Sequence, residues 1–113
     1  MAYDIVYVIE NRDENPDTNF HIIGIYTTPE NLKRGIVNYL NERVQDAFEL
    51  VAATGLDETA SEEYCQQVKR EYRELVAELT TINKMTVEEI ANKALVEYYV
   101  DNIMFYGFRT DSF

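Results

Sequence analysis

Histidine and cysteine are the side chains that most often act as nucleophiles, proton carriers or metal ligands, and this chain has one of each. His21 has no second histidine and no cysteine near it in the sequence, so a metal site or a Ser-His-Asp arrangement lacks partners. Cys65 follows Glu62 and Glu63, whose charges disfavour the reactive thiolate. We therefore interpret His21 as a residue on a strand face and Cys65 as a partly buried structural side chain.

The polar segment at residues 11–19 alternates oxygen-bearing side chains in the manner of a calcium-binding loop. Asp13, Asn15 and Asp17 match the first ligand positions of an EF-hand. However, Thr18 stands where that loop needs glycine, and Gly24 stands where its final glutamate belongs. We predict a solvated acidic turn here and no metal site.

Carboxylates are the remaining source of chemistry. No phosphate-binding glycine loop, C-x-x-C pair or G-x-S-x-G motif occurs. A carboxylate pair brought together from distant segments leaves no spacing in the sequence, so a hydrolase of that kind stays a minor alternative. The prediction is a non-enzymatic protein with no cofactor and no metal.

The net charge of the chain is strongly negative. The chain has 21 acidic and ten basic residues, which gives a net charge of −11. Such a field repels phosphate backbones and anionic lipid head groups, so we expect no direct binding to nucleic acid or membrane. The negative charge favours a basic protein partner. The alternative is that the charge serves only to keep the protein soluble.

The acidic residues concentrate in two blocks, residues 1–20 and residues 56–80, each with a net charge of −4. If the two blocks lie near each other in the fold, they form one negative surface. Three bases in the second block, Lys69, Arg70 and Arg73, are expected to pair with neighbouring acids and to weaken the surface near residues 70–74. The predicted partner-binding residues are therefore Asp13, Glu14, Asp17, Asp57, Glu58, Glu62 and Glu63.

Hydrophobic periodicity and capping signals predict one α+β domain, residues 1–113, with elements in the order ββαααβ. Thr28 precedes Pro29 as a helix cap, Gly55 is a stop signal, and Thr86 with Glu89 forms a capping box. We expect a three-stranded antiparallel sheet with about three helices packed on one of its faces. The predicted strands are 3–10, 20–27 and about 100–109, and the predicted helices are 29–55, one starting within 57–61, and 87 to about 97.

Both faces of the predicted sheet are apolar. In the first strand, Ile5, Tyr7 and Ile9 alternate with Val6 and Val8, and the later strands follow the same pattern. Two apolar faces are usually both covered. Either the helices are divided between the faces, or a partner covers one of them, a second copy of the chain included.

A single cysteine cannot form an internal disulfide, and the first apolar stretch is too short and too charged for a signal peptide. No stretch approaches the roughly 18 apolar residues of a membrane span. The predicted location is the cytoplasm.

In its small size, tyrosine-rich composition, acidity and lack of catalytic motifs, the chain resembles small acidic accessory proteins of phages and mobile elements, the anti-CRISPR proteins among them. The resemblance implies an inhibitor that acts in the host cytoplasm as a DNA mimic, using carboxylates in place of phosphates to occupy a basic, nucleic-acid-binding partner. Two alternatives stay open: a small-molecule sponge or sensor with a tyrosine-lined pocket, and a small dimeric structural or regulatory domain.

Overall fold

Among the residues that the structure describes, the fold has seven elements in the order ββαααββ. The computed structural model describes residues 5–11, 21–101 and 103–109 of the 113-residue chain, with only the backbone of His21. The predicted role of the His21 side chain therefore lies outside the described part. The elements are β1 (Ile5–Asn11), β2 (His21–Tyr26), α1 (Pro29–Leu56), α2 (Glu62–Lys84), α3 (Val87–Ala94), β3 (Tyr98–Val100) and β4 (Ile103–Arg109).

The sheet has four antiparallel strands in the order β2-β1-β4-β3, so the α+β class is confirmed and the prediction of three strands is wrong. The predicted last strand is two strands, because the chain reverses between Val100 and Ile103. Asp101 adopts a φ of 53° at this reversal. Aspartate tolerates the left-handed region better than most residues, which allows a tight turn inside an otherwise strand-like sequence.

The capping signals position all three helices. The Oγ1 of Thr28 accepts a hydrogen bond from the Asn31 amide at 3.2 Å, and Ser61 caps α2 in the same way. At α3, Thr86 Oγ1 accepts from the Glu89 amide at 3.1 Å, and its hydroxyl donates to the Glu89 carboxylate at 3.2 Å. The predicted cap at Thr86 is therefore confirmed, although the Glu89 carboxylate bonds the Thr86 hydroxyl and not the Thr86 amide that would complete a capping box.

Two predicted helix ends are wrong. Helix α1 continues through Gly55 to Leu56, and no glycine has a positive φ. A glycine inside a helix costs about 1 kcal/mol relative to alanine, which a long helix tolerates. Helix α3 ends at Ala94 rather than near residue 97, because Glu97 takes a φ of 59° and turns the chain into β3.

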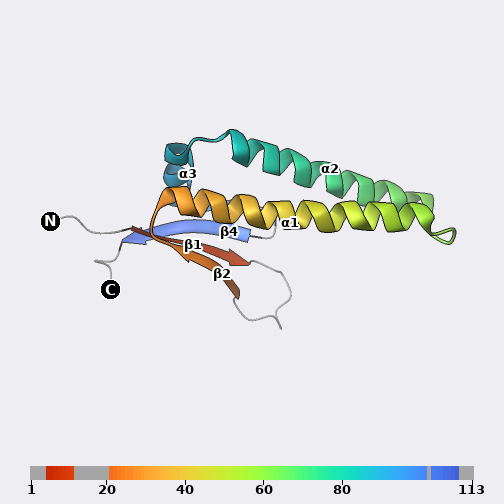
Figure 1. Cartoon of the computed structure of the whole chain (residues 1–113), viewed down its shortest axis with the longest axis horizontal. Coiled ribbons are helices and arrows are strands. Elements are labelled where there is room, and N and C mark those ends of the chain that lie inside the picture. The colour runs from red at the N-terminus through yellow and green to blue at the C-terminus, as the bar shows by residue number, and fades with distance from the viewer. Residues whose placement is uncertain (1–4, 12–20, 102, 110–113) are drawn as a thin grey trace.

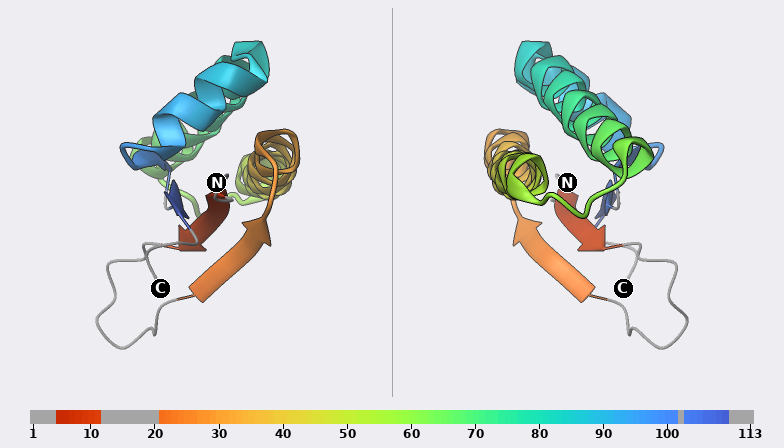
Figure 2. Two further views of the ribbon diagram at one scale, coloured as in Figure 1. Left: turned by 90° about the vertical axis from the view of Figure 1, so that its left-hand side faces the viewer. Right: turned by 90° about the vertical axis from the view of Figure 1, so that its right-hand side faces the viewer.

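All three helices lie on the same side of the sheet (Figures 1 and 2). The prediction that the helices pack on one face is therefore confirmed, and the alternative that they are divided between the two faces is wrong. The core lies between this face and the helices. It is built from Tyr7, Ile9, Ile103 and Phe105 of the sheet and from Leu32, Ile36, Leu40, Ile82 and Ile90 of the helices.

The other face of the sheet is mixed in its exposure. Val8 and Met104 are buried there, whereas Ile22, Ile25 and Tyr99 are more than half exposed. The cross-strand pairs Val8↔Ile25 and Tyr99↔Met104 place these residues on the side opposite the helices. Apolar residues are thus present on both faces, as the sequence predicts.

The paired helices α1 and α2 are much longer than the sheet. Helix α1 has 28 residues and the longest strands have 7. The helix is therefore about 42 Å long, whereas the strands are about 23 Å long. The far half of the hairpin therefore projects beyond the sheet (Figure 1). We call residues 44–77 the arm, because they lie beyond Arg43, whose Nε contacts Asp101 at the end of the sheet.

The projection gives the molecule an elongated shape. Its principal extents are 64 × 34 × 17 Å, and its radius of gyration is 16.8 Å, where a compact chain of this length has about 13 Å. The base of the hairpin is held by Lys33, whose Nζ donates to the carbonyl oxygens of Asn83 at 3.3 Å and Met85 at 2.6 Å. In the described part of the chain, no helix is both long enough and apolar enough to span a membrane.

Candidate functional site: the acidic arm

Four of the seven predicted partner-binding residues lie together at the tip of the arm. Asp57 and Glu58 stand in the loop between the helices, Glu62 and Glu63 form the first turn of α2, and all four are exposed. The other three, Asp13, Glu14 and Asp17, lie outside the described residues. The predicted single surface formed by both acidic blocks therefore stays a prediction.

Asp57 is fixed by its neighbour in the tip loop. Its Oδ1 accepts hydrogen bonds from the Thr59 amide at 2.9 Å and from the Thr59 hydroxyl at 2.7 Å. These two bonds hold the pKa of the Asp57 carboxyl below its ordinary value, because they favour the charged form. The tip therefore presents an ionised carboxylate in a defined turn.

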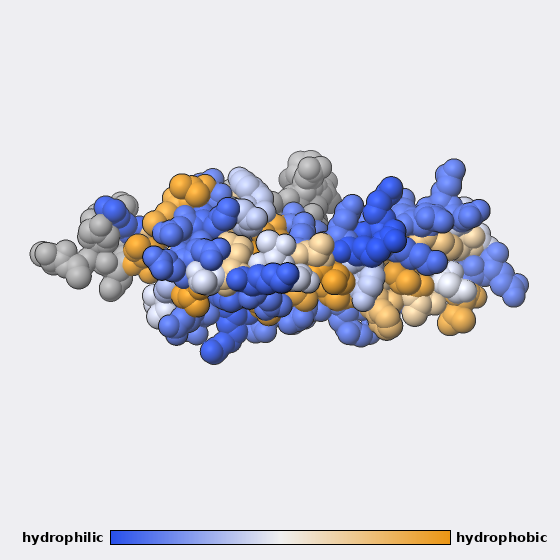
Figure 3. All heavy atoms as spheres, turned by 90° about the horizontal axis from the view of Figure 1, so that it is seen from above, coloured by the Kyte–Doolittle hydropathy of each residue, from blue (hydrophilic) through white to orange (hydrophobic). Residues whose placement is uncertain are grey.

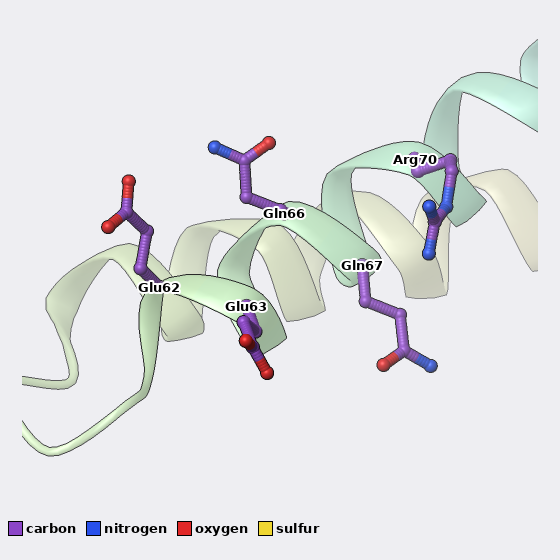
Figure 4. Close-up of a pocket in the computed structure, with 5 residues that line it drawn as sticks. All are labelled: Glu62, Glu63, Gln66, Gln67 and Arg70. Atoms are coloured by element: carbon purple, nitrogen blue, oxygen red, sulfur yellow. The ribbon is translucent and has the colours of Figure 1, made fainter.

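Glu62 and Glu63 occupy the amino end of α2, where the helix dipole favours negative charge. Figure 4 shows their side chains pointing to different sides of the helix, Glu62 with Gln66 and Glu63 with Gln67. The two carboxylates therefore diverge and do not form a chelating pair. Among the described residues, no group of three or more His, Cys, Asp or Glu side chains is arranged to hold a metal ion.

One side of α2 carries acidic residues from the tip to the sheet. The successive spacings from Glu63 through Gln67, Glu71 and Glu74 to Glu78 are 4, 4, 3 and 4 residues, which keeps them on one helix face. The Nε2 of Gln67 donates to Glu71 Oε1 at 3.2 Å, as neighbours on one face can. We call these five residues the acidic flank. It extends for about 22 Å along the helix.

The bases of α2 do not neutralise this flank through ion pairs. None of Lys69, Arg70 and Arg73 forms an ion pair with a described residue, so the predicted local pairing does not occur. At about 100° per residue, these bases centre on a neighbouring side of the helix, and Arg70 alone borders the acidic flank. Sequence reasoning missed Glu71, Glu74 and Glu78 because it assumed this pairing, although the helical spacing could have identified them.

Exposed apolar side chains accompany the charges of the arm. Leu56 at the tip is 85% exposed, and Tyr64, Phe48 and Leu50 are between 44% and 52% exposed. Seen from the side of α2, the surface is mainly hydrophilic and is broken by separate apolar groups, some of them toward the tip and others at the opposite end of the molecule (Figure 3). In the sequence, Leu56 does not share the helical spacing of the apolar residues of α1. This spacing already indicates that Leu56 is exposed.

The acidic flank ends at a polar cluster where the arm meets the sheet. Arg43 Nε lies 3.1 Å from Asp101 Oδ2, and Asp101 in turn faces Glu78. The pKa of the Glu78 carboxyl is raised, mainly by burial and further by the charges of Asp101 and Glu74, although a backbone hydrogen bond from Asp101 opposes this. Burial also raises the pKa of the Tyr39 hydroxyl nearby.

The interior of the arm is thin. Its buried residues among those described are Thr54, Val68 and Leu75, and none of them belongs to the main core cluster. Thr54 satisfies its hydroxyl by donating to the Leu50 carbonyl at 2.7 Å. The arm is therefore a two-helix projection whose amino-acid composition is governed more by its surface than by its core.

Comparison with known proteins adds no relative: no family model matches the chain, and no curated protein or solved structure is significantly similar to it.

Proposed function

We propose that this chain is a non-enzymatic binding protein that uses its arm to occupy a basic, nucleic-acid-binding surface of a partner protein. The observation that carries the proposal is the composition of the arm. Residues 44–77 hold eight acidic and three basic side chains, and they project beyond the sheet (Figure 1). Because it projects, the arm can enter a groove of the partner.

Carboxylates suit such a groove for a geometric reason. The guanidinium group of arginine binds carboxylate and phosphate oxygens with the same planar fork, so an acidic surface can compete with a nucleic-acid backbone. Exposed charges mainly speed the encounter and exclude wrong partners. Leu56 and Tyr64, which are exposed beside the acidic tip, supply apolar contacts that lower the dissociation rate.

Two hollows of the described surface favour this proposal over the small-molecule alternative. The depression beside Glu62 and Arg70 has a volume of about 380 Å³, but its walls come from one helix and it is open to solvent (Figure 4). A second pocket, between α2 and β3, measures about 200 Å³, below the roughly 300–1,000 Å³ of typical ligand sites. Neither hollow is shaped to enclose a metabolite.

The test uses two variants that carry the same net charge of −7 (four neutralised carboxylates from −11). Each is used as bait in cell extracts of the natural host, beside the unaltered protein. We expect the unaltered protein and the control to capture a basic nucleic-acid-binding protein, and the tip variant to lose it. The tip variant is Asp57→Asn, Glu58→Gln, Glu62→Gln, Glu63→Gln, and the control is Glu30→Gln, Glu42→Gln, Glu88→Gln, Glu97→Gln.

The captured partner is then studied in purified form. Added duplex DNA or RNA should displace it, and its affinity should fall steeply between low and high salt, as expected for contacts between exposed charges. Equal capture by both variants would reject the arm as the contact surface. An affinity that does not change with salt would reject the mimicry of phosphates.

A further inference from the structure

A small pocket lies where the acidic flank reaches the sheet. It has a volume of about 200 Å³ and lies between α2 and β3. Strand β3 is at the edge of the sheet, and an edge strand presents backbone donors and acceptors that pair with no neighbouring strand. The lining residues are Ala77, Glu78, Thr81 and Ile82 of α2 and Tyr98, Tyr99 and Val100 of β3.

The pocket combines an apolar wall with an unbalanced negative charge. Ile82 and Val100 are buried apolar side chains at its base. Glu78 Oε2 is buried and accepts no hydrogen bond from a described residue. Asp101 has Arg43 as its ion partner, with the Arg43 Nε at 3.1 Å, whereas Glu78 forms no ion pair with a described residue. The site therefore lacks one positive charge.

We propose that this pocket receives one lysine or arginine side chain of the basic partner. The inference rests on the proposed function and names a specific contact within it. The aliphatic stem would lie against Ile82 and Val100, and the charged head would meet the Glu78 carboxylate and the open edge of β3, as long basic side chains bury their stems and keep their heads polar. The small volume fits one side chain rather than a larger ligand.

The aromatic environment at this edge already accommodates a cation. The Nζ of Lys93 lies 4.8 Å from the centre of the Tyr98 ring, and the centres of the Tyr98 and Phe105 rings are 5.3 Å apart. This shows that ammonium groups are compatible with the helix-facing side of β3. Lys93 is the first cation at this edge, and it lies over the neutral ring of Tyr98. The partner's basic side chain would be a second cation, and it would lie beside the acidic residue Glu78 in the pocket between α2 and β3.

The direct test is an NMR titration of the ¹⁵N-labelled full chain with N-acetyl-arginine amide, and with N-acetyl-glutamine amide as the uncharged control. We expect saturable shifts at residues 77–82 and 98–100 with the arginine compound alone. Glu78→Gln should weaken this binding at least tenfold, whereas Glu74→Gln, on the same flank but outside the pocket, should change it less than twofold. Ala77→Leu, which fills the pocket from an exposed position, should also abolish it.

Three results would overturn the proposal that this pocket binds a basic side chain. They are shifts confined to other residues, equal binding of both compounds, and unchanged binding of the arginine compound by Glu78→Gln. Its failure can be told apart from failure of the proposed function. If the tip variant loses the partner while Glu78→Gln keeps full affinity for it, the arm proposal stands and the pocket fails. If the tip variant keeps the partner, the arm proposal fails whatever the arginine titration shows.

Discussion

A matched pair of leucine substitutions should show that the arm unfolds more easily than the rest of the molecule. Leu40 is fully buried in the main core, whereas Leu75 is 8% exposed and lies in the thin interior of the arm. Leucine-to-alanine changes in cores cost about 2–5 kcal/mol, depending on how far the site can relax around the cavity. The loss of unfolding free energy should therefore be near the top of this range for Leu40→Ala and near the bottom for Leu75→Ala.

These free energies translate into different melting temperatures. A domain of about 100 residues loses roughly 4 °C for each kcal/mol, so a loss of about 4 kcal/mol at Leu40 lowers the Tm by about 16 °C. A loss of about 2 kcal/mol at Leu75 lowers it by about 8 °C at most. Circular dichroism at several temperatures measures both values.

Hydrogen exchange distinguishes local from global unfolding. Leu75→Ala should speed amide exchange in residues 44–77 and leave β1 and β4 nearly unchanged, because the arm can open without the sheet. Leu40→Ala should speed exchange throughout the described structure. Equal losses of Tm together with uniform exchange in both variants would refute the reasoning, because the arm would then be part of one cooperative unit.

Three further outcomes follow from individual contacts. Arg43→Ala should cost less than about 1 kcal/mol of unfolding free energy, because its pair with Asp101 is partly exposed; calorimetry against Arg73→Ala, which breaks no ion pair with a described residue, measures the difference. Glu78 has a folded-state pKa raised above 4.5, so its charged form destabilises the fold at higher pH. Glu78→Gln should therefore raise the Tm at pH 7, and this gain should vanish below pH 4.5; a gain that persists there would contradict the cause. Thr86→Ala should cost about 0.5–2 kcal/mol through loss of the α3 cap, and Thr86→Ser should restore most of it; equal stability of both variants in urea would count against the cap.

Features encoded within a few residues could be predicted from the sequence. In the caps at Thr28 and Thr86, one threonine side chain accepts a hydrogen bond from the backbone amide three positions later, and the structure has both caps. The tip carboxylates Asp57 and Glu62 lie close together because only a short loop separates them. The end of α1 was predicted wrongly at Gly55 because a glycine is compatible both with a stop and with an exposed helical position.

Features that depend on distant contacts could not be predicted. The division of the last strand at Asp101 follows from pairing of β3 with β4, and the sequence there is as apolar and aromatic as one long strand. The pocket at Glu78 joins α2 to β3 across about twenty residues of chain, so no local pattern indicates it.

The projecting arm also determines how the molecule moves in solution. A particle with extents of 64 × 34 × 17 Å experiences more friction than a sphere of the same 13.2 kDa mass. The monomer should therefore elute early from a size-exclusion column and sediment slowly for its mass. An early elution volume alone would imitate a dimer, so light scattering on the same peak is the measurement that distinguishes an elongated monomer from a dimer. Rotational diffusion should be anisotropic as well. Residues whose backbone N–H bond is perpendicular to the arm should have longer ¹⁵N transverse relaxation times than residues whose N–H bond is parallel to it.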